Sequence, residues 1–341
     1  MKFDFIIGNP PYQENIQNEG DRANPLYDKF MTESYKLSDV VELIHPARFL
    51  FNAGQTPKEW NKKMLNDEHF KVLFYTDNSA DIFPQTQIKG GIAITIRDAN
   101  RVFGPIGTFS QYDQLSSIQV KVQKTNSQML DTIVASQGLY RFSDKCFIDN
   151  PYIKEVVGKG TGNKIVSNIL TKLPELFFED VENKTDYVKL LGKIPSGRIS
   201  KYIRSEYLQQ NDYTTKYKVF IPEGNGTGKF GEVLTSPFIG FPGEGAADTY
   251  LVCGPFNSEN DANNFIKYFK TKFFRALLGV FKVTQHSPNK VWSSVPVLNF
   301  SDTSIINWNT TIADIDEQIY KYFKLEQKEI DFIETHVKEM K

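Results

Sequence analysis

The sequence predicts an α/β fold: a doubly wound sheet in the first part of the chain, followed by a larger α+β region. Two observations carry this prediction. The first hundred residues alternate short apolar runs rich in Val, Ile and Phe with segments whose apolar residues recur at helical spacing. Beyond about residue 105 the pattern changes to short segments separated by Gly, Asn and Ser turns. We place the boundary between residues 110 and 111.

The elements expected within the first hundred residues follow one another in the order of crossover connections. β-branched residues mark the strands, and Pro46 closes the second of them. Leu26, Phe30 and Met31 lie roughly on one face of the first helix. Strands are expected over 3–8, 40–46, 70–75 and 90–96, and helices over 25–37 and 58–66.

The tetrapeptide Asn9-Pro10-Pro11-Tyr12 follows the first strand. Two successive prolines cannot continue a sheet or enter a helix interior, because each fixes φ and lacks an N–H. The backbone is therefore stiff just past the strand, where open α/β sheets place their ligands. With an amide before the prolines and an aromatic ring after them, the segment suits a flat, hydrogen-bonding group. A proline-rich turn without a function is the alternative interpretation.

The segment Asp4-Phe5-Ile6-Ile7-Gly8-Asn9-Pro10-Pro11-Tyr12 resembles the catalytic motif of S-adenosylmethionine-dependent DNA methyltransferases that modify the exocyclic amino group of adenine. The resemblance implies that the Asn9 side-chain oxygen and the Pro10 carbonyl accept hydrogen bonds from that amino group and localise its lone pair. Pro11 completes the motif. Tyr12 would stack on the base after it flips out of the duplex. The reaction needs no metal, thiol or histidine.

The resemblance also implies the fold and further site residues. A partial Rossmann-like methyltransferase sheet, the catalytic half, would occupy residues 1–110, and an α+β DNA target-recognition domain would occupy 111–341. Leu43 and Pro46 are candidate contacts of the cofactor, S-adenosylmethionine, although ordinary sheet packing explains them as well. Phe83 is a candidate second aromatic against the flipped base, and a core phenylalanine is as natural there.

One part of that family's fold has no counterpart in the sequence. The glycine-rich turn that binds the methionine part of the cofactor cannot lie in the eight residues before Asn9. Glycine-rich stretches over 158–162, 224–229 and 240–245 lack the flanking strand and helix, and the acid about 20 residues on, that such a turn requires. We interpret them as loops. We therefore expect the catalytic and recognition portion of a larger enzyme that is cut or split within its sheet. If the enzyme is split, a partner chain would carry the cofactor-binding half.

The overall formal charge of −1 hides an uneven distribution. Residues 151–300 hold 19 basic and 14 acidic side chains, and residues 262–301 hold six basic and no acidic ones. Such a stretch can be a solvated face, or it can contact nucleic-acid phosphates. Amide side chains can read adenine and lysine can read guanine. The DNA-binding candidates are Arg198, Lys201, Arg204, Lys272, Arg275, Lys282, Gln285, His286, Asn289 and Lys290.

The C-terminal part contains the most regular helical pattern. A single helix is expected over 259–278, begun by a capping pair of Ser258 and Asp261, with an apolar stripe that belongs to the core. Two short helices are expected in the tail. The segments 268–278, 291–300 and 308–341 resemble the recognition region of gamma-class adenine methyltransferases of type II restriction–modification systems.

Composition excludes several classes of protein. A chain of 341 residues that is 40% hydrophobic and 24% charged is globular and long enough for two domains. No apolar run approaches the ~20 residues of a membrane span, and no signal-peptide pattern opens the chain. We therefore expect a cytoplasmic protein without membrane contact. Two cysteines, Cys146 and Cys253, and four scattered histidines predict neither disulfides nor a metal site.

Three functions are compatible with these patterns. The first is site-specific adenine-N6 methylation of double-stranded DNA in a restriction–modification system. The second is a DNA-recognition module, or a truncated fragment, that is inactive without a separate cofactor-binding half. The third is methylation of RNA or of a protein amide, since the tetrapeptide is shared by enzymes that act on other planar amino groups. The long region over 190–341 argues against the third.

Overall fold

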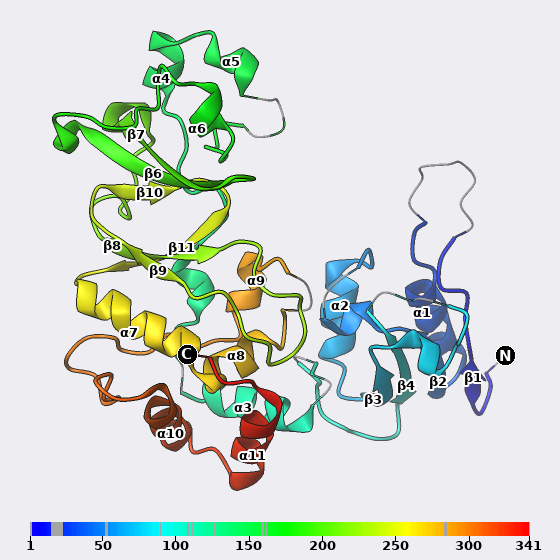
Figure 1. Ribbon diagram of the computed structural model, residues 1–341. Coiled ribbons are helices and arrows are strands. Elements are labelled where there is room, and N and C mark those ends of the chain that lie inside the picture. Colours follow the sequence, from blue (N-terminus) through cyan, green and yellow to red (C-terminus); the bar gives the residue numbers. More distant parts are fainter. Residues whose placement is uncertain are drawn as a thin grey trace. The chain divides into compact units, whose positions relative to one another are not determined.

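The computed structural model describes residues 2–14, 23–51, 54–86, 88, 90–107, 109–110, 112–125, 127–157, 160, 162–282 and 285–340. The chain divides into two compact units, unit 1 over Met1–Ser116 and unit 2 over Ser117–Lys341, each drawn with its own sheets in Figure 1. The division falls inside helix α3 (Asp113–Gln123), a few residues beyond the boundary that the sequence suggests. The predicted mixture of helices and strands is confirmed in both units.

Unit 1 is built on a four-stranded mixed sheet with the order β1-β2-β4-β3. Strand β1 pairs with β2 in parallel, and β4 is antiparallel to β2 and β3. Each element that the sequence predicts before residue 100 is present, with ends shifted by a few residues at most. The elements are β1 (Ile6–Gly8), α1 (Tyr27–Leu37), β2 (Val40–Pro46), η1 (Arg48–Phe51), α2 (Lys58–Leu65), β3 (Phe70–Thr76), η2 (Ser79–Asp81) and β4 (Ile92–Asp98).

The core of unit 1 lies between one face of this sheet and the helices α1 and α2. Val41 and Leu43 of β2 pack in one buried cluster with Met31 of α1 and Met64 of α2. His45 points to the same face: its Nε2 lies 2.7 Å from Thr95 Oγ1, and its ring stacks on Tyr27. Burial lowers the pKa of His45 to about 4, so the ring is neutral at pH 7.

The opposite face of the sheet carries apolar side chains that are partly or fully exposed in the described part of the chain. Ile7 is 71% exposed, and Ile44, Ile94 and Phe74 form a cross-strand row of which none is buried. Sheets with parallel strands normally have both faces covered, because crossover helices lie on each. The doubly wound arrangement is therefore corrected for the described residues, since α1 and α2 join the same core. Strand β1 is also an edge strand.

Unit 2 contains two further sheets, of order β10-β6-β7 and β5-β11-β8-β9, drawn in green and yellow in Figure 1. Residues of both sheets join one buried cluster, including Leu190, Ile203 and Phe220. The strands are β5 (Val134–Ala135), β6 (Tyr187–Ile194), β7 (Gly197–Arg204), β8 (Tyr217–Pro222), β9 (Phe238–Gly240), β10 (Glu244–Ala246) and β11 (Tyr250–Phe256). The helices are α4 (Asp144–Asp149), α5 (Ile153–Val156), α6 (Ile169–Lys172), α7 (Glu259–Lys270), α8 (Lys272–Leu278), α9 (Asn289–Trp292), α10 (Ile312–Tyr322) and α11 (Gln327–His336).

The predicted helix over 259–278 is two helices. Ser258 caps the start of α7, as expected, by accepting a hydrogen bond from the Asp261 amide. The break falls at Thr271, which is extended and accepts a hydrogen bond from the Phe274 amide through its hydroxyl. The carboxylate of Asp316 in α10 accepts from the two amides that open α8. The apolar spacing over 259–278 continues across Thr271, but the helix does not. The buried Thr271 cap, together with a carboxylate 44 residues beyond Lys272 and 43 beyond Phe273, begins a second helix there.

Other features of unit 2 follow the sequence more closely. The tail forms the two expected helices, α10 and α11, and buries Ile315, Ile319 and Ile333. The stretch 224–229 is a loop, as expected, and Glu232 accepts hydrogen bonds from the amides of Thr227 and Gly228. Of the stretch 158–162, three residues lie outside the described part of the chain. Among the described residues, no helix is long and apolar enough to cross a membrane.

Candidate functional site

The candidate site of unit 1 begins where β1 ends. Asn9 and Pro11 are exposed, and Tyr12 is half-buried. The Tyr12 carbonyl accepts a hydrogen bond from the Leu26 amide, which ties the tetrapeptide to the start of α1. Tyr12 is therefore placed by two elements, the strand before it and the helix after it.

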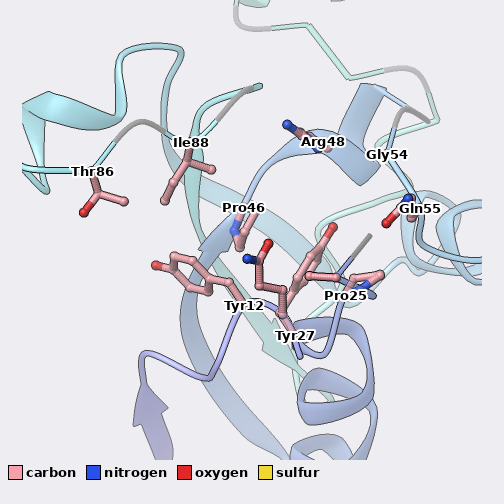
Figure 2. Close-up of a pocket in the computed structure, with 11 residues that line it drawn as sticks. Tyr12, Pro25, Tyr27, Pro46, Arg48, Gly54, Gln55, Thr86 and Ile88 are labelled. Atoms are coloured by element: carbon pink, nitrogen blue, oxygen red, sulfur yellow. The ribbon is translucent and has the colours of Figure 1, made fainter. Parts of the chain in front are cut away.

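Tyr12 lines a cavity of about 470 Å³, within the range of pockets that bind small ligands. The other lining residues come from the start of α1, the segment after β2 and the loop before β4, as Figure 2 shows. They are Gln13, Ala23, Pro25, Tyr27, Pro46, Arg48, Gly54, Gln55, Thr86 and Ile88. We call this the Tyr12 cavity.

Two aromatic rings meet beside the Tyr12 cavity. Phe83 packs edge-on against Tyr12, with ring centroids 6.5 Å apart and planes at 66°. The buried hydroxyl of Ser79 fixes the loop that carries Phe83, because it donates to the Thr86 carbonyl and accepts from the Ile88 amide. The sequence singled out Phe83, whereas the role of Ser79 depends on contacts across the loop.

The Tyr12 hydroxyl is buried and has no hydrogen-bond partner among the described residues. Burial also raises the pKa of Tyr12. An unsatisfied buried hydroxyl costs about 1–3 kcal/mol.

The two predicted cofactor contacts separate in the structure. Pro46 lines the Tyr12 cavity. Leu43 does not; it is buried in the core of unit 1, and its Cδ2 lies 3.6 Å from the position that a Cβ on Gly8 would occupy. Leu43 is thus corrected to a packing residue, because β2 directs residues 41, 43 and 45 to the face under α1 and α2.

The predicted DNA-binding residues of unit 2 fall into groups that differ in availability. Arg275 is only 2% exposed and donates to the carbonyls of Glu232 and Lys270. Lys282 is also buried and lies 3.9 Å from the Glu232 carboxylate. These two are corrected: their charges are used inside unit 2 and cannot reach a phosphate in this conformation.

Several other candidates are partly or fully exposed but already hold partners. Lys201 pairs with Glu179 and Lys272 with Glu334. Asn289 donates to the Asp131 carbonyl through its amide nitrogen. These partners would have to be exchanged before the side chains could contact DNA.

The remaining candidates are exposed. Arg198, in the β6–β7 hairpin, stacks over Phe238 of β9. Arg204 lies 3.6 Å from Glu206, and Lys290 lies over the ring of Phe281. Gln285 and His286 are exposed, and His286 Nδ1 lies 2.8 Å from Glu223. Within the described ranges, no group of three or more His, Cys, Asp or Glu side chains is arranged to hold a metal.

Comparison with known proteins finds similarity over the N-terminal region. Residues 1–83 match the family described as Eco57I restriction-modification methylase. Over 103 residues the chain is 32% identical to an uncharacterized adenine-specific methylase of Mycoplasma pneumoniae (strain ATCC 29342 / M129 / Subtype 1). That match covers 29% of this chain and 24% of the relative, so the chain corresponds to about a quarter of that protein's length. The resemblance to adenine methyltransferases is confirmed.

Three solved structures show some likeness to this chain. The type IIG restriction endonuclease BpuSI is 10% identical, with a TM-score of 0.34 and coverage of 97% of this chain and 52% of that one. The type IIL restriction-modification enzyme MmeI, in complex with DNA, is 10% identical, with a TM-score of 0.38 and coverage of 98% and 56%. The type ISP enzyme LlaGI, with a DNA substrate mimic, is 12% identical, with a TM-score of 0.34 and coverage of 98% and 35%. TM-scores this low do not establish a shared fold.

Proposed function

We propose that this protein takes part in adenine-N6 methylation of double-stranded DNA in a restriction–modification system. The match of residues 1–83 to a restriction-modification methylase family supports this. The methyl group would come from S-adenosylmethionine and the acceptor would be an adenine flipped out of the duplex. The observation that carries the proposal is the Asn-Pro-Pro-Tyr segment at the carboxyl end of β1, with Tyr12 and Phe83 beside a cavity.

The residues of this segment have distinct roles in the proposal. The adenine amino nitrogen is a poor nucleophile because its lone pair is delocalised into the ring. Asn9 would accept one of its hydrogen bonds through the side-chain oxygen and Pro10 the other through the carbonyl, which localises the lone pair. Tyr12 would stack on the flipped base, with Phe83 as the second ring. Pro11 fixes the backbone between them, so the acceptors stay aligned.

The cavity fits only part of the methyl donor, which supplies an electrophilic methyl group when bound. Pro46 offers an apolar contact for its adenine ring. No carboxylate lines the Tyr12 cavity among the described residues, although a ribose is usually held by an acidic side chain. The remaining contacts are assigned to a further polypeptide segment, on this chain or on a partner chain.

The partly exposed face of unit 1, opposite α1 and α2, is where that segment would dock. Its strand would pair with the open edge of β1, and its helix would cover Ile7, Ile44 and Phe74. Edge strands and exposed apolar patches are features that proteins otherwise avoid. The alternative is a DNA-recognition module without activity. It rests on the same observation, that the described lining of the Tyr12 cavity provides only part of the cofactor contacts.

DNA contact is assigned to unit 2. Arg198, Arg204, Lys290, Lys201 and Lys272 would contact phosphates, and Gln285, His286 and Asn289 would lie near the bases. Those that hold partners within unit 2 would exchange them for DNA. The basic β6–β7 hairpin, the start of α8 and the segment from 285 to 290 provide these side chains.

Two measurements test the proposal. Calorimetry of the chain with S-adenosylmethionine separates the enzyme from the recognition module, because saturable binding by the chain excludes the second reading. Transfer of labelled methyl to duplex DNA, RNA and protein, with any chain encoded beside it that carries a glycine-rich cofactor turn, identifies the substrate. Labelling of RNA or protein but not of DNA would overturn the proposal.

A further inference from the structure

Two basic side chains lie opposite each other near the tip of the β6–β7 hairpin of unit 2, drawn in green in Figure 1. Lys193 of β6 is the direct partner of Arg198 of β7, and both side chains are exposed. Residues paired in this way lie on the same face of the two strands, with Cβ atoms about 4.5–5.5 Å apart. Like charges at such positions repel, so the pair weakens the hairpin as long as no anion neutralises it.

The other face of the hairpin is packed in the core of unit 2. Leu190 and Ile203 are buried there. Gly192 belongs to the same face, because a Cβ placed on it would lie 2.8 Å from Leu170 Cδ1 of α6. Side chains alternate between the two faces along a strand. Lys193, the neighbour of Gly192, is therefore directed away from the core.

The tip pair differs from the other cations of the hairpin in its surroundings. Lys189, for example, lies 3.9 Å from the Glu244 carboxylate. Within the described ranges, neither Lys193 nor Arg198 forms an ion pair. The residues of unit 2 outside those ranges are asparagine, glycine, lysine, threonine and valine, so none of them adds an acidic side chain. The tip therefore carries two positive charges with which no aspartate or glutamate of unit 2 is paired in the described structure.

Other contacts hold the two residues in place. The Lys193 amide donates a hydrogen bond to the Ser167 hydroxyl at 3.0 Å, and this hydroxyl lies 2.8 Å from the Thr249 hydroxyl. Arg198 Cζ lies 4.6 Å from the centre of the Phe238 ring. A guanidinium over a ring keeps the N–H groups in its own plane available for a phosphate. Backbone anchoring and stacking thus reduce the ordering that an anion would impose on binding.

We propose that Lys193 and Arg198 form a phosphate clamp, which contacts two neighbouring phosphates of one strand of duplex DNA. The inference rests on the proposed function; it adds Lys193 to the DNA contacts and pairs it with Arg198. Phosphates recur every ~3.4 Å of helix axis along one strand, whereas the grooves separate the strands by about 6 and 12 Å. The spacing of the pair fits neighbouring phosphates better than phosphates across a groove. Duplex is favoured over single-stranded DNA, because the partly buried Phe238 ring already has the guanidinium over its face and cannot stack on a base.

The test is the binding of a labelled DNA duplex by the full chain, followed by fluorescence anisotropy at several salt concentrations. Lys193→Gln should weaken binding about tenfold at low salt and reduce the magnitude of the slope of log affinity against log salt by about 1. Arg198→Gln should have a similar effect, and the double variant should reduce the slope by about 2. Lys172→Gln, at an exposed lysine of α6, is the matched control and should leave the slope unchanged.

Urea denaturation separates binding from folding. Lys193→Gln removes a repulsion, so its denaturation midpoint should equal or exceed that of the wild-type chain. A lower midpoint would show that the Lys193 ammonium is used by a contact within the chain, and the clamp would then be rejected.

Four binding results would also reject the clamp. They are a wild-type slope in Lys193→Gln, a double variant with the slope of Arg198→Gln alone, an equal loss in Lys172→Gln, and no binding of the duplex by the wild-type chain. Failure of the methyltransferase function would show differently, as absent methyl transfer to DNA while the slopes of the variants change as expected.

Discussion

The Asn9-Pro10-Pro11-Tyr12 segment of unit 1 and the basic segments of unit 2 were both singled out in the sequence, but their side chains have different surroundings in the structure. The motif of unit 1 lies at a strand end, with Asn9 exposed and the Tyr12 hydroxyl without a hydrogen-bond partner in the described ranges. In unit 2, Arg275 and Lys282 are buried, and Lys201 and Lys272 hold ion pairs. A short motif with an unusual backbone identifies chemistry, whereas a run of positive charge does not show whether its charges face a ligand or the protein itself.

The largest expected effect concerns Asn9. Asn9→Ala removes one acceptor at the reacting nitrogen, and loss of one such aligned contact typically costs about 10²–10³-fold in rate. DNA affinity should change by less than a few-fold, because the side chain acts on the reacting nitrogen. Labelled methyl transfer to duplex DNA, with the cofactor site complete, measures this. Asn100→Ala, an exposed asparagine of the same unit, is the control; equal rates for both variants would remove Asn9 from the mechanism.

Arg275 tests the other side of the comparison. Arg275→Ala should lower the free energy of unfolding by about 3 kcal/mol, because two charged hydrogen bonds to carbonyls are lost from a buried site. Urea denaturation measures the change. Arg204→Ala, at an exposed arginine, should cost less than about 0.5 kcal/mol. If Arg275→Ala left stability unchanged but weakened DNA binding, Arg275 would be a DNA contact after all.

His45 makes unit 1 sensitive to acid. The pKa of His45 is about 4 in the folded chain and about 6.5 when unfolded, so the unfolded state binds more protons between these values. The unfolding free energy is unaffected by this group above pH 6.5 and falls as the pH is lowered toward 4. The decrease amounts to about 2 kcal/mol at pH 5. Unfolding of unit 1, followed at pH 7 and pH 5, measures this. His45→Gln should remove the difference; an undiminished acid dependence in that variant would assign it to other groups.

The smallest expected effect belongs to the exposed arginines of unit 2. Arg198→Ala should weaken DNA binding to a similar extent across sequences and reduce the slope of log affinity against log salt by about 1, as for one phosphate contact. Fluorescence anisotropy at several salt concentrations provides the slope. Lys63→Ala, an exposed lysine of α2 in unit 1, is the control. If both variants reduced the slope equally, the assignment of DNA contact to unit 2 would fail.

Much of unit 1 could be predicted because its signals are local. Strand β2 and helix α2 begin where the pattern places them, since proline, β-branched residues and apolar spacing act within a few residues. The helix over 259–278 could not be predicted in the same way. The Thr271 hydroxyl and the distant Asp316 carboxylate together end one helix and begin the next, and no window of sequence contains both.

The sequence by itself determined the chemistry that unit 1 can offer: Asn9, the two prolines and Tyr12 form one continuous segment whose stiffness is covalent. Only the tertiary structure decided which residues join that segment. It brought Phe83 and Arg48 to the cavity region and placed Leu43 in the core, and it buried Arg275. The physical reason is that burial and cavity lining depend on contacts between elements distant in sequence. Leu43 and Pro46 lie on one strand, yet Leu43 packs in the core and Pro46 lines the cavity.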